Sequence, residues 1–293
     1  MAARGPRTSA PLERITIVGA GLIGASIALA LRRALPGCRL TGVDPDRGVC
    51  AVIVPGVVDA ATDDLAEGLR DAQLVFVACP VDAMAQVFET IARVAPPDCL
   101  VTDCGSTKSS VAAAAAEAFG ADSPRFLAGH PIAGSEGSGP AAARADLFDG
   151  RIWLLCPAGP AQERMATRLG GLLERFGARV ESIHPAAHDA MFAEFSHWPH
   201  AVAFTLCASI ADGAFAEAAR HFSGAGLRDT TRIGASSATL WAGILLDNRE
   251  SALASARRFR EKLDALEGAL EASDRDTLEA LFGAASRWRR SVD

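Results

Sequence analysis

His130 stands where a short apolar stretch of the chain ends. Phe126-Leu127-Ala128-Gly129 leads into this histidine, and a loop of small residues with one carboxylate, Glu136, follows it. An imidazole titrates near neutral pH, so a histidine within reach of a ligand can take a proton from a hydroxyl. We therefore expect His130 to act as a general base. The alternative is a histidine that only stabilises its loop.

Ser106 stands at the end of a second apolar stretch. Cys99-Leu100-Val101-Thr102 runs into Asp103-Cys104-Gly105-Ser106. The Ser106 hydroxyl is suited to orient either the histidine or a substrate hydroxyl. It is also suited to cap the helix that follows, and one serine can do both.

Two histidines in the second half of the chain share one face of a helix. His197 and His200 are three residues apart in Ser196-His197-Trp198-Pro199-His200. His188 is a third histidine nearby, but no acidic ligand at a firm spacing accompanies the three. We predict no metal site and expect these histidines to lie in the core or to face a substrate.

A second polar group follows two glycines in Gly224-Ala225-Gly226-Leu227-Arg228-Asp229-Thr230-Thr231-Arg232-Ile233. The planar guanidinium of Arg232 can hold a carboxylate through two parallel hydrogen bonds. The alternative is a surface salt bridge between Asp229 and Arg232. Glu136 and Asp229 are also acids that could close a gate with an Arg or Lys side chain.

The first element that must support such a site is a loop that binds a dinucleotide. A β-rich stretch, Arg14–Val18, ends in Gly19-Ala20-Gly21-Leu22-Ile23-Gly24, a helical pattern follows, and a second strand, Arg39–Val43, ends at Asp44. The glycines permit a tight turn, close approach to a pyrophosphate and close packing of the helix. Asp44 would accept from a ribose and repel a 2′-phosphate, which favours NAD over NADP, although Arg47 lies close enough to blur that choice.

Strands and helices alternate after this loop. Strands are predicted at Leu74–Ala78, which ends at Cys79-Pro80, and at 99–102, 126–129, 152–155 and 179–183, with helices at 81–94, 111–119 and 161–176. This alternation of strands and helices predicts an α/β fold with a parallel, doubly wound sheet. Ligands of such sheets lie at the carboxyl ends of the strands, so the glycine loop, Cys79, Pro80, Ser106 and His130 should share one edge.

The character of the sequence changes after residue 184. Apolar helical stretches lie at 188–210 and 248–271, and Ser273-x-x-Asp276 predicts the start of a last helix. We predict a flexible N-terminus at 1–12, a Rossmann-like NAD-binding domain at 13–184, and an all-helical domain for substrate binding and dimerisation at 185–293. The apolar stretch at 191–210 should be buried, as in a homodimer.

Composition excludes several classes of protein. A net charge of −6 disfavours nucleic acid as a partner, because its phosphates need a basic face. The sequence contains no run of about 18 apolar residues, so we predict no membrane span. Residues 1–12 lack the apolar core of a signal peptide. The seven cysteines are scattered and form no C-x-x-C pair, which suits a reducing cytoplasm and predicts neither zinc nor disulfides.

Taken together, these motifs resemble the prephenate and arogenate dehydrogenase family of tyrosine biosynthesis. The resemblance runs from Ile15 to about Phe259 and rests on the order of the motifs, which are the Gly19–Gly24 loop, Asp103–Lys108, Gly129–Glu136, Ser196–His200, Asp229–Ile233, Leu240-Trp241 and Leu245–Asn248. It implies an enzyme that oxidises and decarboxylates the small molecules prephenate or arogenate, or both, with NAD.

The resemblance also implies roles for individual residues. It implies His130 as the base, Ser106 as its hydrogen-bonding partner, Arg232 as the clamp on a substrate carboxylate, His200 and His197 as pocket residues, Glu136 and Asp229 as an ionic gate, and Trp241 as a residue near the pocket. The helical domain forms the dimer in this family. Trp198 departs from the family pattern, which usually has leucine there, and its bulk could reshape the pocket.

Other assignments remain open. A related enzyme could oxidise an amino-substituted analogue of prephenate in secondary metabolism. A β-hydroxyacid-type NAD(P) dehydrogenase would need a catalytic lysine on a helix, and none stands between Met191 and Arg220. A dinucleotide-sensing protein without catalysis would have no need for His130, Ser106 and Arg232 together.

Overall fold

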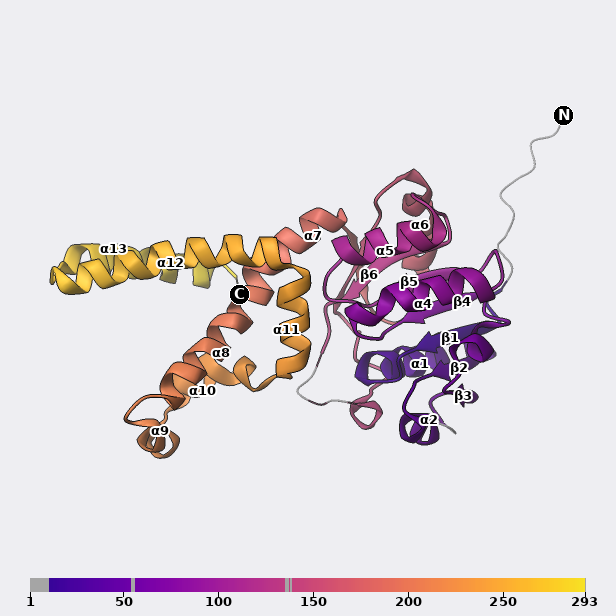
Figure 1. Ribbon diagram of the computed structural model, residues 1–293, viewed down its shortest axis with the longest axis horizontal. Helices are drawn as coiled ribbons and strands as arrows, with labels where there is room; N and C mark the ends of the chain where they lie inside the picture. The colour runs from indigo at the N-terminus through magenta and orange to yellow at the C-terminus, as the bar shows by residue number, and fades with distance from the viewer. Residues whose placement is uncertain (1–10, 54–55, 135–136, 138, 293) are drawn as a thin grey trace. The chain divides into compact units, whose positions relative to one another are not determined.

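The computed structural model describes residues 11–53, 56–134, 137 and 139–292 (Figure 1). The chain divides into two compact units. The first, the sheet unit, comprises Met1–Asp189 and Ser236–Asp247, and the second, the helical unit, comprises Ala190–Ala235 and Asn248–Asp293. Glu136 and residues 1–10 of the predicted N-terminal segment lie outside the described residues.

Within the described residues, the sheet unit is built on one eight-stranded sheet. Its strands are β1 (Arg14–Val18), β2 (Arg39–Val43), β3 (Ala60–Thr62), β4 (Leu74–Val77), β5 (Leu100–Asp103), β6 (Phe126–Pro131), β7 (Ile152–Cys156) and β8 (Arg179–Ser182). Their order in the sheet is β3-β2-β1-β4-β5-β6-β7-β8. The chain builds the sheet from β1 toward one edge as far as β3, then returns to place β4 on the other side of β1, so the strand order reverses between β1 and β4. Such a reversal leaves a crevice at the carboxyl ends of these two strands, where ligands of doubly wound sheets bind.

The predicted parallel, doubly wound arrangement holds from β3 through β6. At the far edge it needs a correction, because β7 is antiparallel to β6 and β8 runs parallel to β7. A parallel neighbour needs a long crossover, which is usually a helix. The described residues between β6 and β7 contain only a 3₁₀ turn, Pro140–Ala142, so the chain returns from the same end of the sheet.

Helices cover both faces of the sheet (Figure 1). They are α1 (Leu22–Ala34), α2 (Arg47–Ile53), α3 (Leu65–Leu69), α4 (Val81–Val94), α5 (Ser109–Phe119) and α6 (Pro160–Glu174). Side chains alternate along a strand, so the sheet supplies two apolar cores. On the face that α1 and α6 cover, Phe76 of β4 packs edge-on against Trp153 of β7, with 6.3 Å between ring centroids. On the other face, the ring centroids of Phe126 in β6 and Phe88 in α4 lie 5.1 Å apart.

Helix α11 (Ala238–Asp247) belongs to the sheet unit, although the segments before and after it belong to the helical unit. It packs against α4, and the Ser110 hydroxyl of α5 donates a 2.6 Å hydrogen bond to Asp247. Trp241 is therefore part of the sheet unit. The predicted domain boundary at residue 184 stays a prediction, and the compact units divide the chain at Asp189 and on either side of α11.

The helical unit is built on a long pair of helices, α12 and α13. Its elements are the end of α7 (Pro185–Phe192), a π-helical turn (Ala193–His197), α8 (Trp198–Ala211), α9 (Ala216–Phe222), α10 (Ala225–Thr231), a 3₁₀ turn (Arg232–Ala235), α12 (Arg249–Glu271) and α13 (Arg275–Arg290). The start of α13 corrects the sequence prediction. The cap is Asp274, whose carboxylate accepts from Thr277 N at 3.0 Å, and not Ser273, whose φ of +52° places it outside the helix.

The apolar stretch at 191–210 is only partly buried within this unit. Phe192, Ala193 and Ala203 are buried, whereas Met191 and Phe195 are 42% and 54% exposed. No single described helix is long and apolar enough to cross a membrane. The bent pair Pro185–Ala211 and Ala216–Phe222 passes that test only when its two parts are added across a 113° bend.

Candidate active site

The glycine loop between β1 and α1 is shaped for close approach of a ligand. Gly19 has a φ of +90°, and a Cβ there would lie 2.7 Å from the Ala78 carbonyl. A Cβ on Gly24 would lie 1.9 Å from the Gly19 oxygen, so α1 packs this closely only through a glycine. The Cβ position of Gly21 has no atom within 4 Å, which leaves the backbone open on that side. The loop geometry suits the tasks that the sequence assigns to these glycines.

A pocket of about 720 Å³ opens beside this loop. Its lining includes Gly19, Gly21, Asp44, Cys79 and Pro80, which come from the ends of β1, β2 and β4. Helix α1 begins here without a side-chain cap, so its first N–H groups and its positive dipole end can meet an anion. These residues fit a dinucleotide whose phosphates lie at the start of α1.

Asp44 is held in this pocket by two backbone groups. Its Oδ2 accepts from Ala20 N at 2.9 Å, and its Oδ1 accepts from Asp46 N at 3.0 Å. The carboxylate is thereby fixed at the end of β2, where the ribose of a dinucleotide is expected. Arg47 is paired with Asp63, at 2.6 Å between Nε and Oδ2. Since the nearby cation already has an acidic partner, the local charge favours NAD over NADP.

The other predicted cofactor residues support the loop without lining the pocket. Ala20 supplies its N–H to Asp44, Leu22 and Ile23 form the partly buried first turn of α1, and Gly24 is buried beneath Gly19. Ser106 does not line this pocket.

His130 lies in β6, and a buried ion pair holds the strand beside it. Lys108 and Asp103 are both 0% exposed, and their side chains form a salt bridge. Lys108 Nζ also donates to the Gly129 carbonyl at 2.7 Å, and the Gly129 N–H donates to Asp103 at 3.0 Å. Such added hydrogen bonds are what make a buried pair tolerable. The backbone next to His130 is thus fixed through both its donor and its acceptor.

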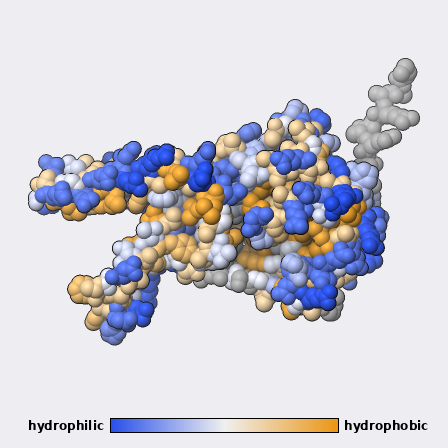
Figure 2. Space-filling view, in the orientation of Figure 1, coloured by the Kyte–Doolittle hydropathy of each residue, from blue (hydrophilic) through white to orange (hydrophobic). Residues whose placement is uncertain are grey.

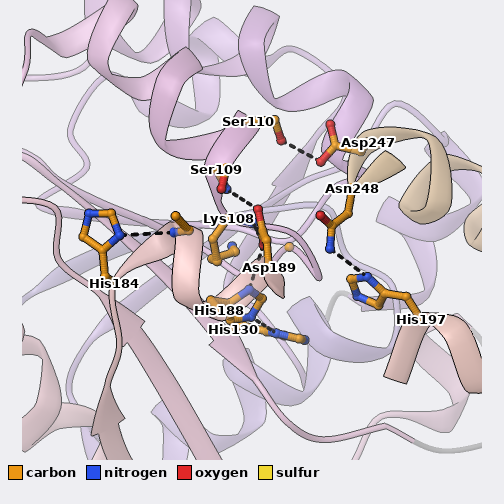
Figure 3. A network of polar contacts seen from close by, with 12 residues as sticks. Lys108, Ser109, Ser110, His130, His184, His188, Asp189, His197, Asp247 and Asn248 are labelled. Carbon is orange, nitrogen blue, oxygen red and sulfur yellow. Dashed lines mark hydrogen bonds and ion pairs between the residues drawn. The ribbon is translucent and has the colours of Figure 1, made fainter. Parts of the chain in front are cut away.

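The His130 ring joins a chain of polar contacts that ends in a carboxylate (Figure 3). Its Nδ1 lies 2.8 Å from His188 Nε2, and His188 Nδ1 lies 2.8 Å from Asp189 Oδ1. His130 is half-buried, whereas His188 is completely buried. Burial lowers the pKa of His188, against the opposite influence of Asp189. Burial would raise the pKa of Asp189, but hydrogen bonds from His188, Ser109 and Lys108 hold it below its ordinary value.

Ser106 does not make the contacts that the sequence suggests. Within the described residues its side chain forms no hydrogen bond, and Nδ1 of His130 faces His188 instead. The capping interpretation is wrong. Asp189 takes that role at the start of α5, where it accepts the N–H groups of Lys108 and Ser109. A contact of Ser106 with a substrate hydroxyl stays a prediction.

The two predicted histidines of the helical unit are both held by polar contacts. His197 is buried, and its Nδ1 lies 3.2 Å from Asn248 Nδ2. His200 Nδ1 donates to the Ser196 carbonyl at 2.9 Å. Burial and the nearby charge of Arg232 lower the pKa of His200. A neutral His200 therefore carries its proton on Nδ1 and presents an unprotonated Nε2.

Asp229 in α10 and Arg232 in the turn after it are exposed. In the part of the chain that the structure describes, the salt bridge between them that the sequence offers as an alternative is absent. Trp198 packs edge-on against Phe259 of α12, with 6.1 Å between ring centroids. Its bulk therefore serves packing within the helical unit.

Two family models match almost the whole chain. Residues 27–182 match the model described as prephenate dehydrogenase, nucleotide-binding domain, and residues 184–284 match the model described as prephenate dehydrogenase, dimerization domain. The chain belongs to the prephenate dehydrogenase family. The predicted family, its oxidoreductase class and a Rossmann-type domain that uses NAD are confirmed.

Relatives of this dehydrogenase are similar along most of its length. The prephenate dehydrogenase of Bacillus subtilis is 32% identical over 280 residues, which are 94% of this chain and 75% of the relative. The structure of prephenate dehydrogenase from A. aeolicus in complex with hydroxyphenyl propionate and NAD+ has a TM-score of 0.89 at 28% identity and covers 98% of this chain and 100% of that one. The structure of Synechocystis arogenate dehydrogenase has a TM-score of 0.80 at 29% identity, with 96% and 100% covered.

The predicted site residues of this dehydrogenase fall into both units. His130, Ser106 and Trp241 belong to the sheet unit, and His197, His200, Asp229 and Arg232 belong to the helical unit. The sheet unit brings His130 together with His188 and Asp189, and the helical unit places His200 within electrostatic reach of Arg232. Among the described residues, no group of three or more His, Cys, Asp or Glu side chains could hold a metal ion.

The sequence did not predict that Asp103, Lys108, His188 and Asp189 support His130, although the first two residues could have been recognised. Asp103 and Lys108 are opposite charges that follow an apolar strand, and charges at such a buried place need partners. His188 was expected to lie in the core or to face a substrate, and it is buried, but nothing local in the sequence connects it or Asp189 with His130. Their contacts reach His130 and Lys108 across 58 and 81 residues of sequence.

Proposed function

We propose that His130 is the base that takes the hydroxyl proton when this dehydrogenase oxidises and decarboxylates its substrate. The activity itself is the NAD-dependent oxidative decarboxylation of prephenate or arogenate in tyrosine biosynthesis. The observation that carries the proposal is the contact of His130 Nδ1 with His188, because a neutral imidazole that donates through Nδ1 has its basic lone pair on Nε2. His130 also stands at the carboxyl edge of the sheet that carries the dinucleotide pocket.

The proposed base acts at the oxygen of the carbon that is oxidised. NAD⁺, when bound, accepts the hydride from the ring carbon that bears the 4-hydroxyl. His130 Nε2 takes the proton of that hydroxyl while the oxygen becomes a carbonyl. When the ring then loses CO₂, the electrons of the broken carbon–carbon bond make the ring aromatic, and the oxygen regains a proton.

We assign substrate binding to the residues for which the family resemblance implies it. Arg232 would hold a substrate carboxylate, with His200 and His197 lining the pocket, and Ser106 would orient the substrate hydroxyl. Trp241 would lie near the pocket, and Asp229 would form an ionic gate with Glu136. The lowered pKa of His200 supports its part, since a neutral ring can accept a hydrogen bond beside the Arg232 cation.

We also propose a homodimer that forms through the helical domain in the cytoplasm. The match to the dimerization-domain model supports it. The helical unit leaves large apolar side chains exposed, among them Phe215, Phe222, Leu253, Phe259, Leu263, Leu270, Phe282 and Trp288. Figure 2 shows apolar surface along these helices beside a polar face, and patches of this kind mark interfaces. The seven free cysteines suit a reducing compartment.

Steady-state rates of the purified protein test the proposed function. Prephenate and arogenate should each be tried with NAD and with NADP, and production of NADH should be followed. The proposal expects turnover with at least one substrate and a preference for NAD. A protein that binds NAD but turns over neither substrate would refute it.

A further inference from the structure

The contacts of Asp189 decide the state of its carboxyl group. Oδ1 accepts the Lys108 N–H at 2.8 Å, and Oδ2 accepts the Ser109 N–H at 2.7 Å. A backbone N–H can only donate, so both oxygens act as acceptors. Such hydrogen bonds favour the charged form and hold the pKa of Asp189 below its ordinary value, so the group is a carboxylate at neutral pH. Because it is 5% exposed and bound to the first turn of α5, this carboxylate has a fixed position.

The fixed carboxylate in turn decides the tautomer of His188. Asp189 Oδ1 lies 2.8 Å from His188 Nδ1, and a carboxylate oxygen accepts only, so this ring nitrogen carries a proton. His188 is 0% exposed, and burial opposes a second proton on the ring. Its Nε2 is therefore an unprotonated acceptor.

The acceptor on His188 then decides the tautomer of His130. His130 Nδ1 lies 2.8 Å from His188 Nε2, so His130 must donate through Nδ1. In the neutral imidazole only one nitrogen carries a proton. His130 Nε2 is thus left unprotonated, with a lone pair that can accept a substrate proton.

We propose that His188 and Asp189 are positioning residues that keep His130 in the one neutral tautomer able to act as a base at Nε2. This inference rests on the proposed role of His130. Neither residue has to touch the substrate. When His130 accepts a proton at Nε2, its Nδ1–H stays bonded to His188, and the carboxylate at the end of the chain stabilises the new positive charge.

Among the described residues, three charged groups act on His188, the middle ring of this chain. Asp189 lies on α7 beside His188, Lys108 lies directly before α5, and Asp103 ends β5. Asp189 and Asp103 favour a positive charge on His188, and Lys108 opposes it. Since Lys108 and Asp103 are paired with each other, Asp189 is the anion that this inference invokes for His130.

The direct test reads the ring protons of the unmodified full-length protein. Two-bond proton–nitrogen spectra of the chain labelled with ¹⁵N-histidine distinguish the tautomers of its six histidines. His130→Asn and His188→Asn assign two of the rings by removing their signals. We expect His130 protonated at Nδ1 only and His188 protonated at Nδ1 only. A neutral His130 with its proton on Nε2 would overturn the proposal, whether or not any variant folds.

Asp189→Asn tests the consequence for catalysis. The substitution replaces the carboxylate by a neutral amide, so the anion that stabilises a positive charge on the two rings is removed, and proton uptake at His130 Nε2 becomes less favourable. We expect kcat to fall about 10²- to 10⁴-fold. The low-pH limb of the kcat/KM profile should also move to lower pH, because the anion that favours a protonated His130 is gone. KM should change little.

The matched control is His184→Gln, which replaces an exposed histidine just before α7 that lies outside the chain of contacts. It should keep the wild-type rate and pH profile. A merely structural role of Asp189 would lower stability without moving the low-pH limb of the kcat/KM profile, and that result would overturn the inference. Failure of the proposed role of His130 is a different outcome, since His130→Asn would then turn over prephenate or arogenate at a near-normal rate.

Discussion

The sheet unit and the helical unit differ in how much of their functional surface they complete by themselves. In the sheet unit, the groups around His130 are closed off from water, and Asp103, Lys108 and His188 are each 0% exposed. In the helical unit, Arg232 is exposed, and Phe215 and Phe222 are each 80% exposed. The buried charges around His130 have partners within the sheet unit, whereas the helical unit leaves large apolar side chains exposed.

This difference suggests a division of labour. A base must be held in one orientation and one protonation state, which requires rigid, buried partners. The proposed substrate-binding residue Arg232 lies on the exposed surface of the helical unit, which a second copy of the chain would help to cover in the proposed dimer. Substitutions in the two units should therefore change different quantities.

The largest effect is expected at the proposed base. His130→Asn removes the acceptor nitrogen and should lower kcat about 10²- to 10⁴-fold with prephenate or arogenate. The affinity for NAD should not change, because His130 does not line the dinucleotide pocket. Steady-state rates and a titration with NAD measure the two quantities. A variant with near-normal kcat would show that another group is the base.

The next effect concerns stability and separates buried from exposed ion pairs. Lys108→Met leaves Asp103 buried without its counter-charge and should lower the free energy of unfolding by about 3–5 kcal/mol. The control is Arg275→Ala in α13, which breaks an exposed pair with Glu279 and should have no measurable effect. Denaturant unfolding compares them. Equal effects of the two substitutions would contradict the contrast between the units.

A smaller effect is expected at the proposed carboxylate clamp. Arg232→Ala should raise KM about 10- to 100-fold, since a charged hydrogen bond contributes about 1.5–3 kcal/mol. Arg228→Ala, on the exposed side of α10, is the control and should leave KM unchanged. An unchanged KM in the Arg232 variant would mean that the carboxylate is held elsewhere.

The last effect is on assembly. Phe282→Glu places a charge on the apolar face of α13, where the side chain is 55% exposed, and should shift the protein toward the monomer. Val52→Asp, at a 64% exposed apolar side chain in α2 of the sheet unit, should leave the molar mass unchanged. Light scattering over a range of concentrations measures both. If only the Val52 variant disrupted the dimer, the interface would lie on the sheet unit, which contradicts the proposal.

Local patterns in the sequence predicted the parts of the fold that are encoded locally. The helix at Val81–Val94 is found with its predicted bounds, and the glycine loop precedes α1 as expected. The short strand β3 was not predicted, because three residues are too few to show an alternating pattern. The antiparallel direction of β7 was not predicted either, because it depends on the connection before the strand and not on the residues of the strand.

The candidate site was predicted less completely, because contacts between residues far apart in the sequence leave no local pattern. His130 stood out because its type and its place at a strand end are visible in sequence. Its partner His188 is 58 residues away, and the contact exists only once α7 has packed beside β6. Ser106 was the nearer and more obvious partner, and the structure gives that place to a histidine.

The stoichiometry of the reaction tests the central claim most directly. Purified protein supplied with NAD and with prephenate or arogenate, labelled in the ring carboxylate, should release one CO₂ for each NADH formed. Decarboxylation coupled to oxidation gives this ratio and an aromatic product. NADH formed without release of labelled CO₂ would show a simple alcohol dehydrogenase and contradict the account.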